Sequence, residues 1–316
     1  MSSVVVTGGT GFVGANLVHR LVDQQIHDVY VIVRKESRYW RLQDILDKIH
    51  LVEADICDLA VLTNLFTTIR PRVVFHLATY GAYPYRLGQP YQQDVDKMLE
   101  TNVLAATQLI RAAIASQVET VISVGSSSEY GPKEHAMSEN DPCVPVDIYG
   151  ATKLSGAQIS TVLANRGGIS FYYFRLFSVY GAFEEDGRLI PTVMKAFLQS
   201  NPLRLASPNS VRDFTYIDDA TRGIMYPLEA SVPPGIYNLG TGVQSSVHDV
   251  VTVLQKISPT SCTVEYGSIP PRPGEPRTWV ADVAKIRALG WEARRDLASG
   301  LQLTYDWFGQ HMQHYL

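Results

Sequence analysis

The stretch Val4-Val-Val-Thr-Gly8-Gly-Thr-Gly11-Phe-Val-Gly14 decides the fold. Its β-branched residues predict a buried strand, and the glycines that follow predict a tight turn into a helix. Gly8 permits the turn, Gly11 lets the backbone approach a pyrophosphate, and Gly14 allows close packing of the helix on the sheet. The stretch therefore predicts a dinucleotide site, with a glycine-rich structural turn as the alternative.

The segments that follow alternate short apolar runs with helical patterns. The predicted strands are Val4–Val6, Val29–Val33, Ile49–Glu53, Val73–Ala78, Thr120–Val124 and Ser170–Phe174. Continuously apolar strands separated by helices predict an α/β fold, a doubly wound parallel sheet of the Rossmann type. After about residue 177 glycines, prolines and short elements dominate. We therefore expect a dinucleotide-binding domain over 1–176 and a smaller, mixed substrate-binding region over 177–316, with about 211–240 packing back on the first domain.

Composition narrows the class of protein. The chain is 46% hydrophobic and 18% charged, with a net charge of -4, so no nucleic-acid partner is expected. Its three cysteines are widely spaced, which fits a reducing cytoplasm. Because neither a signal peptide nor a bilayer-spanning apolar run is visible, we expect a cytoplasmic protein with no membrane contact. We predict no metal site.

The residues after the second strand bear on the choice of dinucleotide. The helix opens at Phe12 and Val13, whose backbone faces the predicted phosphates. An NAD site usually carries an acidic residue at the tip of the second strand, but this strand ends in Arg34. Arg34 could pair with a 2′-phosphate, so NADP(H) is favoured over NAD, with a solvated basic loop as the alternative. Asp55 and Ile56 end the third strand and either line the adenine pocket or form a turn.

Tyr149-Gly-Ala-Thr-Lys153 places a phenol and an ammonium one helical turn apart. The ammonium can stabilise a phenolate, which suits proton transfer to or from an alcohol or ketone. Asn102 lies within the apolar stripe of a helix predicted over 92–116. A buried amide should have polar partners, so Asn102 is a candidate for the same site, with an ordinary boundary residue as the alternative.

These motifs resemble the extended short-chain dehydrogenase/reductases, in particular the nucleotide-sugar epimerase, dehydratase and reductase group. The resemblance covers nearly the whole chain. Besides the glycine-rich stretch, it rests on Asp55-Ile56, His76-Leu-Ala78, Asn102, Ser126-Ser-Ser-Glu-Tyr-Gly131, Tyr149-Gly-Ala-Thr-Lys153, Arg175-Leu-Phe-Ser-Val-Tyr-Gly181, Arg212-Asp-Phe-Thr-Tyr-Ile-Asp-Asp219, Asn238-Leu-Gly-Thr-Gly242 and Leu289-Gly-Trp291.

The resemblance implies roles for the residues of the site. Tyr149 would be the general acid/base, and Lys153 would lower the pKa of Tyr149 and bind the nicotinamide ribose. Ser126 would hydrogen-bond the reacting oxygen, and Asn102 would join the same polar network. Leu77 and Ala78 would lie along the cofactor.

The neighbours of Ser126 bear on the reaction. Related 4,6-dehydratases place an Asp-Glu pair after the catalytic serine or threonine, where this chain has Ser127 and Ser128. Because neither hydroxyl ionises readily, elimination of water is disfavoured. Arg34 then favours an NADPH-dependent reductase of a nucleotide-diphosphate-linked 4-keto-6-deoxyhexose. The alternative is a nucleotide-sugar epimerase with tightly bound NAD, and a non-catalytic cofactor-binding protein is least favoured.

Three arginines are candidates for the sugar-nucleotide diphosphate, because guanidinium groups bind phosphate by two hydrogen bonds. Arg212 begins the Arg-Asp-Phe motif, Arg272 lies in a segment that related enzymes use near the pyrophosphate, and Arg188 is a weaker candidate. The alternative for all three is a surface arginine. Ser178 stands where relatives often carry an asparagine that touches the substrate. Tyr80 belongs to a loop whose aromatic rings either stack on the sugar or pack the loop. As in relatives, we expect a homodimer.

Overall fold

The computed structural model describes residues 3–26, 28–82, 91–270 and 276–315, with side chains from residue 94 in the helix that starts at Tyr91. The chain divides into two compact units, which are described separately. The first comprises Met1–Gly131, Pro142–Arg175 and Ile224–Tyr237, and the second comprises Pro132–Asp141, Leu176–Gly223 and Asn238–Leu316. Most of the second unit follows Leu176, where the sequence places the boundary at residue 176. This unit also includes 132–141, and 224–237 belongs to the first unit.

A seven-stranded parallel sheet forms the centre of the first unit, in the order β11-β6-β5-β4-β1-β2-β3. Its strands are β1 (Val4–Thr7), β2 (Val29–Val33), β3 (His50–Glu53), β4 (Val73–His76), β5 (Thr120–Ser126), β6 (Ser170–Leu176) and β11 (Gly235–Leu239). All residues of β1 and β4 are buried, as the continuous apolar runs predict. This confirms the doubly wound α/β fold, and the strand missed from the sequence is β11.

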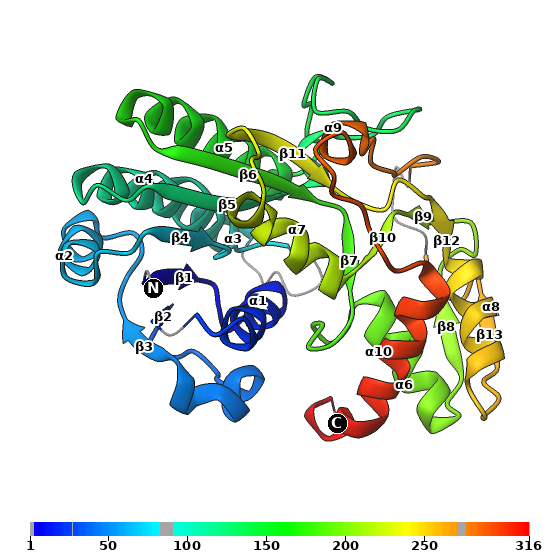
Figure 1. The fold of residues 1–316 in the computed structure, drawn as a ribbon. Coiled ribbons are helices and arrows are strands. Elements are labelled where there is room, and N and C mark those ends of the chain that lie inside the picture. The colour runs from blue at the N-terminus through cyan, green and yellow to red at the C-terminus, as the bar shows by residue number, and fades with distance from the viewer. Residues whose placement is uncertain (1–2, 27, 83–90, 271–275, 316) are drawn as a thin grey trace. The chain divides into compact units, whose positions relative to one another are not determined.

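Helices cover both faces of this sheet (Figure 1). Helix α1 (Phe12–Asp23) lies on one face, and α2 (Leu59–Ile69), α4 (Ala105–Ala115) and α5 (Ile148–Gly167) lie on the other, where α4 contacts both α2 and α5. A 3-10 segment, Trp40–Lys48, joins β2 to β3. Leu62, Phe66 and Leu109 bury their side chains against the sheet, and each such burial contributes about 1.5–3 kcal/mol.

The helix predicted over 92–116 has a wide turn in its middle. It consists of α3 (Tyr91–Met98), a π-helical segment (Leu99–Leu104) and α4. Asn102 lies within the π-helical segment and is buried. A Cβ at Gly156 of α5 would overlap the carbonyl oxygen of Asn102, so the two helices touch through their backbones here. Such π turns are frequent at functional sites.

The second unit is built from short strand pairs and helices. Its strands are β7 (Ser178–Tyr180), β8 (Leu203–Leu205), β9 (Val211–Arg212), β10 (Phe214–Tyr216), β12 (Ser245–Ser246) and β13 (Val264–Tyr266). They pair as β7 with β10, β8 with β13 and β9 with β12. Its helices are α6 (Leu189–Gln199), α8 (Val247–Ile257), α9 (Ala284–Arg287) and α10 (Leu297–His311), and α7 (Ile217–Glu229) runs from this unit into the first. The core lies where α10 contacts α6 and α8.

Two buried polar side chains hold the loops of the second unit. The Asp213 carboxylate accepts hydrogen bonds from the backbone of Thr241 (2.8 Å), Gly242 (3.0 Å) and Ala281 (3.2 Å). Burial raises the pKa of Asp213, and these bonds oppose that rise. The Asn238 amide donates to the carbonyl of Met137 at 2.8 Å. Two motifs that mark the family resemblance therefore have structural roles.

No helix in the parts of the chain that the structure describes is both long and apolar enough to cross a membrane.

Candidate active site

The glycine-rich turn forms a cradle at the carboxyl end of β1. Gly8 has a φ of +72°, a conformation that favours glycine, and its carbonyl accepts from the amide of Gly11 at 3.0 Å. A Cβ at Gly14 would overlap this carbonyl, and a Cβ at Gly8 would overlap the backbone of Leu77 and Ala78. The three glycines thus lie together with Leu77 and Ala78, and the backbone is packed too closely at Gly8 and Gly14 for any side chain. This geometry fits a bound dinucleotide.

The start of α1 is suited to phosphate. No side chain caps the helix at Gly11, and its first turn has no acidic residue, so its amide groups remain available for an anion. Phe12 is buried and Val13 is half-buried. Phe12 therefore packs the helix against the unit and could reach a cofactor only through its backbone.

The tip of β2 differs from a dedicated 2′-phosphate site. Arg34 is exposed, and its Nε lies 3.3 Å from the carboxylate of Glu36, which is also exposed. Arg41, in the segment after β2, is buried and donates to the carbonyl of Thr10 in the glycine-rich turn at 3.3 Å. Its guanidinium lies 4.5 Å from the ring centre of Trp40. Arg41 is therefore part of the turn's support.

Asp55 and Ile56 follow β3 in the predicted position. The Asp55 carboxylate accepts from the amide of Cys57 at 2.9 Å, which is the turn-forming arrangement. Ile56 is half-buried against the core of the first unit. A contact with adenine stays a prediction for both residues.

The three predicted catalytic side chains come from two neighbouring elements. Ser126 ends β5, and its Oγ accepts from the amide of Ser128 at 3.1 Å. Tyr149 and Lys153 lie one turn apart near the start of α5, which Asp147 caps by accepting from the amide of Gly150 at 2.6 Å. Tyr149 is half-buried and Lys153 is buried. Burial lowers the pKa of Lys153 to about 8, although the charge of Glu129 opposes this.

Asn102 connects α5 to the loop after β4. Its Oδ1 accepts from the amide of Tyr80 (3.0 Å) and from Thr79 Oγ1 (3.1 Å), and its Nδ2 donates to the carbonyl of Tyr80 at 2.9 Å. Nδ2 also donates to Thr152 Oγ1 at 3.0 Å, and this hydroxyl donates to the carbonyl of Tyr149. The expected polar partners of Asn102 are confirmed, and its catalytic role stays a prediction.

Tyr80 is held by its own side chain as well. Its hydroxyl donates to Asp94 Oδ1 at 2.7 Å, and the Lys97 ammonium lies 5.7 Å from its ring centre. The hydrogen bond to Asp94 is the main reason that the pKa of Tyr80 is raised. These contacts favour packing of the loop over a ring free to stack on a sugar. The end of this loop lies outside the described residues.

Ser127 and Ser128 form a short 3-10 turn with Glu129 directly after Ser126. Ser127 is buried and Ser128 is half-buried. Glu129 is one residue beyond the positions of the dehydratase Asp-Glu pair, and its side chain is fully buried. The turn thus offers hydroxyl groups, and its one carboxylate is enclosed.

The remaining predicted substrate residues belong to the second unit. Ser178 starts β7, and its amide donates to the carbonyl of Asp213 at 2.9 Å. Arg188 precedes α6 and pairs with the buried Glu184 at 3.2 Å. Arg212 lies 5.8 Å from the ring centre of Trp279 and donates to its neighbour's carbonyl. Arg272 lies outside the described residues, so its role remains a prediction from the sequence.

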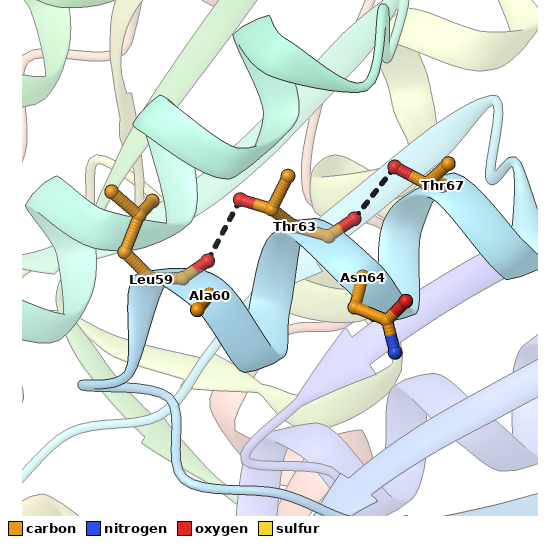
Figure 2. Close-up of a pocket in the computed structure, with 5 residues that line it drawn as sticks. All are labelled: Leu59, Ala60, Thr63, Asn64 and Thr67. Carbon is orange, nitrogen blue, oxygen red and sulfur yellow. Dashed lines mark hydrogen bonds between the residues drawn. The ribbon is translucent and has the colours of Figure 1, made fainter.

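A hollow on α2 is separate from these residues. It is lined by Leu59, Ala60, Thr63, Asn64 and Thr67 (Figure 2). Thr63 and Thr67 each donate to the carbonyl four residues earlier, at 2.7 and 2.8 Å. Their hydroxyls are thereby engaged by the helix itself, and none of the residues predicted for the active site line this hollow.

Sequence reasoning missed three buried polar residues of the site. His76 lies beside Thr7, with Nδ1 and Oγ1 2.8 Å apart, and burial lowers its pKa to about 3. Thr152 links Asn102 to Tyr149, and Glu129 binds Arg175. All three residues lie within the motifs quoted in the sequence analysis. Their residue types alone did not show that their side chains face the site.

Most of the chain matches a known protein family. Residues 4–240 match the model of the NAD dependent epimerase/dehydratase family. An uncharacterized UDP-glucose epimerase of Bacillus subtilis, YtcB, is 28% identical, over 90% of this chain and 91% of its own length. A UDP-glucose 4-epimerase of Mycolicibacterium smegmatis is also 28% identical, over 98% of this chain and 99% of its own length.

A solved structure shares the fold throughout. The UDP-glucuronic acid 4-epimerase from Bacillus cereus, in complex with UDP-glucuronic acid and NAD, superposes with a TM-score of 0.86 at 29% identity. The match covers 98% of this chain and 99% of that one. With the glycine cradle and the Tyr149–Lys153 helix in place, this chain belongs to the NAD dependent epimerase/dehydratase family.

Proposed function

We propose that this protein is a 4-epimerase of sugars linked to a nucleoside diphosphate and that it keeps NAD bound throughout its reaction. The arrangement that carries the proposal is Ser126 at the end of β5, with Tyr149 and Lys153 one turn apart on α5 and serines in place of the dehydratase carboxylates. The similar 4-epimerase with NAD and a UDP-sugar supports this choice.

Tyr149 acts as the acid/base in this proposal. It takes the proton of the sugar hydroxyl and later returns one to the same oxygen, while Ser126 hydrogen-bonds that oxygen. Lys153, with a pKa of about 8, carries its charge at neutral pH and favours the phenolate form of Tyr149. The glycine-rich turn of residues 8–14 would hold NAD, which when bound would supply reversible hydride transfer at the sugar carbon.

This proposal replaces the NADPH-dependent reduction that the sequence favours. That expectation depends on Arg34, which is exposed and paired with Glu36. The similar solved structure carries NAD, which supports the alternative cofactor and with it the alternative reaction. A preference for NADP(H) has no support beyond Arg34 itself.

Binding of the substrate by residues of the second unit is part of the proposal. Arg212 and Arg188 would hold the diphosphate, and the Trp279 ring keeps the Arg212 guanidinium in place by a cation–π contact. Ser178 would contact the sugar nucleotide. The substrate class is a UDP-linked hexose or hexuronic acid, as in the relatives.

A homodimer is part of the proposal. Helix α5 exposes Ile148 (37%), Ile159 (40%) and Val162 (52%), and the π-helical segment that α5 packs against exposes Leu99 (48%) and Leu104 (42%). A second copy of the chain could cover these apolar residues. Light scattering after size exclusion should give twice the chain mass, and I159E/V162E should give the single mass.

The test starts with the purified protein. We expect the dinucleotide released on denaturation to be NAD, identified by mass spectrometry. Incubation with UDP-glucose, UDP-galactose and UDP-glucuronic acid in turn should convert at least one into its 4-epimer, seen by proton NMR, without added cofactor. The Tyr149→Phe variant is the control for contaminating activity.

Two outcomes would overturn the proposal. Release of NADP(H), together with stoichiometric NADPH consumption on a 4-keto-6-deoxyhexose nucleotide, would reinstate the reductase. Retention of NAD with no conversion of any nucleotide sugar would remove the epimerase assignment and leave only a cofactor-binding protein.

A further inference from the structure

Glu129 is a fully buried carboxylate three residues after Ser126. Its Oε1 accepts from the amide of Ser126 at 2.8 Å and from the hydroxyl of Tyr173 at 2.7 Å. Its Oε2 accepts from Arg175 Nε at 2.9 Å. With three donors around it, the carboxylate is engaged within the protein, and the reaction steps proposed above do not use it.

Two glycines allow this arrangement. A Cβ at Gly125 would overlap Glu129 Oε1 and the Tyr173 ring. A Cβ at Gly150, next to Tyr149, would overlap the carbonyl oxygen of Ser128. The first turn of α5 therefore lies directly on the turn that carries Glu129, and the two segments have little freedom to shift.

Tyr173 joins Glu129 to the lysine turn of α5. Its hydroxyl lies 2.7 Å from Glu129 Oε1 and 3.3 Å from the carbonyl oxygen of Lys153. Lys153 is 5% exposed, so its ammonium has lost most of its hydration. A buried cation of this kind needs a negative charge nearby, and Glu129 is the carboxylate of this cluster.

The charges around Lys153 come from several elements. Glu129 and His76 interact electrostatically with Lys153, and Tyr173 interacts with Glu129, Tyr149 and Arg175. Of these, only Glu129 is a carboxylate, and it is paired with Arg175. Arg175 places a positive charge against the same carboxylate.

We propose that Glu129 is a positioning residue for the Ser126, Tyr149 and Lys153 site. It fixes the backbone of Ser126 directly and accepts a hydrogen bond from the Tyr173 hydroxyl, which lies against the backbone of Lys153, and its negative charge keeps the buried Lys153 side chain in the ammonium form. As a statement about the reaction, this rests on the proposed function. The relation between the charges of Glu129 and Lys153 does not depend on turnover.

The test is a titration of Lys153 in protein labelled with ¹³C-lysine. The chain has eight lysines, and the signal lost in Lys153→Met identifies the one of interest. In Glu129→Gln, which keeps an acceptor oxygen but removes the charge, we expect the midpoint for Lys153 to fall by about one pH unit or more. The alkaline limb of the rate profile should move in the same direction.

Arg175→Met is the matched variant. Removing this cation should raise the midpoint for Lys153, opposite to the effect of Glu129→Gln. A loss of packing would disturb both variants in the same way, whereas a charge effect predicts opposite signs. If Glu129→Gln does not fold, the direction in which Arg175→Met shifts the Lys153 midpoint decides the question. Tyr173→Phe, which changes no charge, should leave the midpoint within about 0.3 unit of wild type.

The outcomes separate this inference from the proposed function. An unchanged Lys153 midpoint in Glu129→Gln, or shifts of the same sign in both charge variants, would refute the role of Glu129. Absence of any sugar-nucleotide conversion by the wild type would refute the proposed function and leave the titration result standing.

Discussion

The central sheet carries two polar clusters that are built in opposite ways. At the end of β5, Glu129 and Arg175 are almost fully buried, at 0% and 4% side-chain exposure, and their contact is 2.9 Å. After β2, Arg34 and Glu36 are 72% and 69% exposed, and their contact is 3.3 Å. An exposed pair contributes only about 0–1 kcal/mol, whereas breaking a buried one costs about 3–5 kcal/mol.

The type of a buried, hydrogen-bonded residue supports a functional inference better than the type of an exposed residue does. Packing and several hydrogen bonds fix the groups around Ser126, so the type of a residue there indicates where its polar atoms lie. At Arg34 solvent competes with any ligand, so the residue type implies little. The following variants test this contrast, beginning with the largest expected effect.

Tyr149→Phe should abolish most of the reaction. Removing a general acid/base lowers the rate by about 10²–10⁴-fold, because the sugar oxygen then has no proton donor or acceptor. Epimerisation followed by NMR measures the loss. The amount of NAD that co-purifies should be unchanged, because the hydroxyl is not needed for the glycine cradle. Activity within tenfold of wild type would show that the buried cluster does not serve the chemistry.

Gly156→Ala should destabilise the protein, although alanine favours helices. The new Cβ would overlap the carbonyl of Asn102, and such overpacking costs about 1–3 kcal/mol. Urea unfolding measures the free energy. The control is Gly309→Ala in α10, where the nearest side-chain atom is 3.8 Å from the added Cβ; this change should be neutral or stabilising by about 1 kcal/mol. Equal effects at both sites would contradict the backbone contact between α5 and the π turn.

His76 should make stability depend on acid pH. Burial, with the Lys153 charge, lowers its pKa to about 3, whereas the unfolded side chain takes up a proton near pH 6.5. The unfolded state therefore binds more protons between these values, and the free energy of unfolding falls as the pH falls, by about 1.4 kcal/mol per pH unit.

The measurement compares His76→Asn with wild type by urea unfolding at pH 6.5 and 5.0. Asparagine can keep a hydrogen bond to Thr7 but does not titrate. The variant should lose less stability over this interval than wild type. Parallel losses in the two proteins would mean that His76 is protonated in the folded state.

Arg34→Ala should have the smallest effect. Since its guanidinium is solvated and paired with Glu36, the affinity of cofactor-free protein for NAD should change by less than about threefold. Calorimetry with NAD and with NADP in parallel measures both affinities. A drop of tenfold or more for NADP alone would show that the exposed cluster is a phosphate site after all.

Prediction from sequence worked where backbones must approach closely. Local spacing along the chain determines the arrangement of the glycines of residues 8–14 and of the pair Tyr149–Lys153. Such spacing can be read directly from a sequence. Prediction was weaker where the outcome depends on long-range packing. The π turn at Asn102 lies against Gly156, which is 54 residues away in the chain. The exposure of Arg34 and the enclosure of Glu129 likewise depend on neighbours that no local pattern specifies.

The π turn also changes the phase of the residues along the helix that contains it. A wide turn holds one residue more than an α-helical turn, so the part before Leu99 is out of phase with the part after Leu104. If the same residues formed a continuous α-helix instead, the turns before Leu99 would be rotated by about 100° relative to those after Leu104. Asp94 would then leave the hydroxyl of Tyr80. For this segment, the width of the turn is therefore as much a part of the site as residue identity.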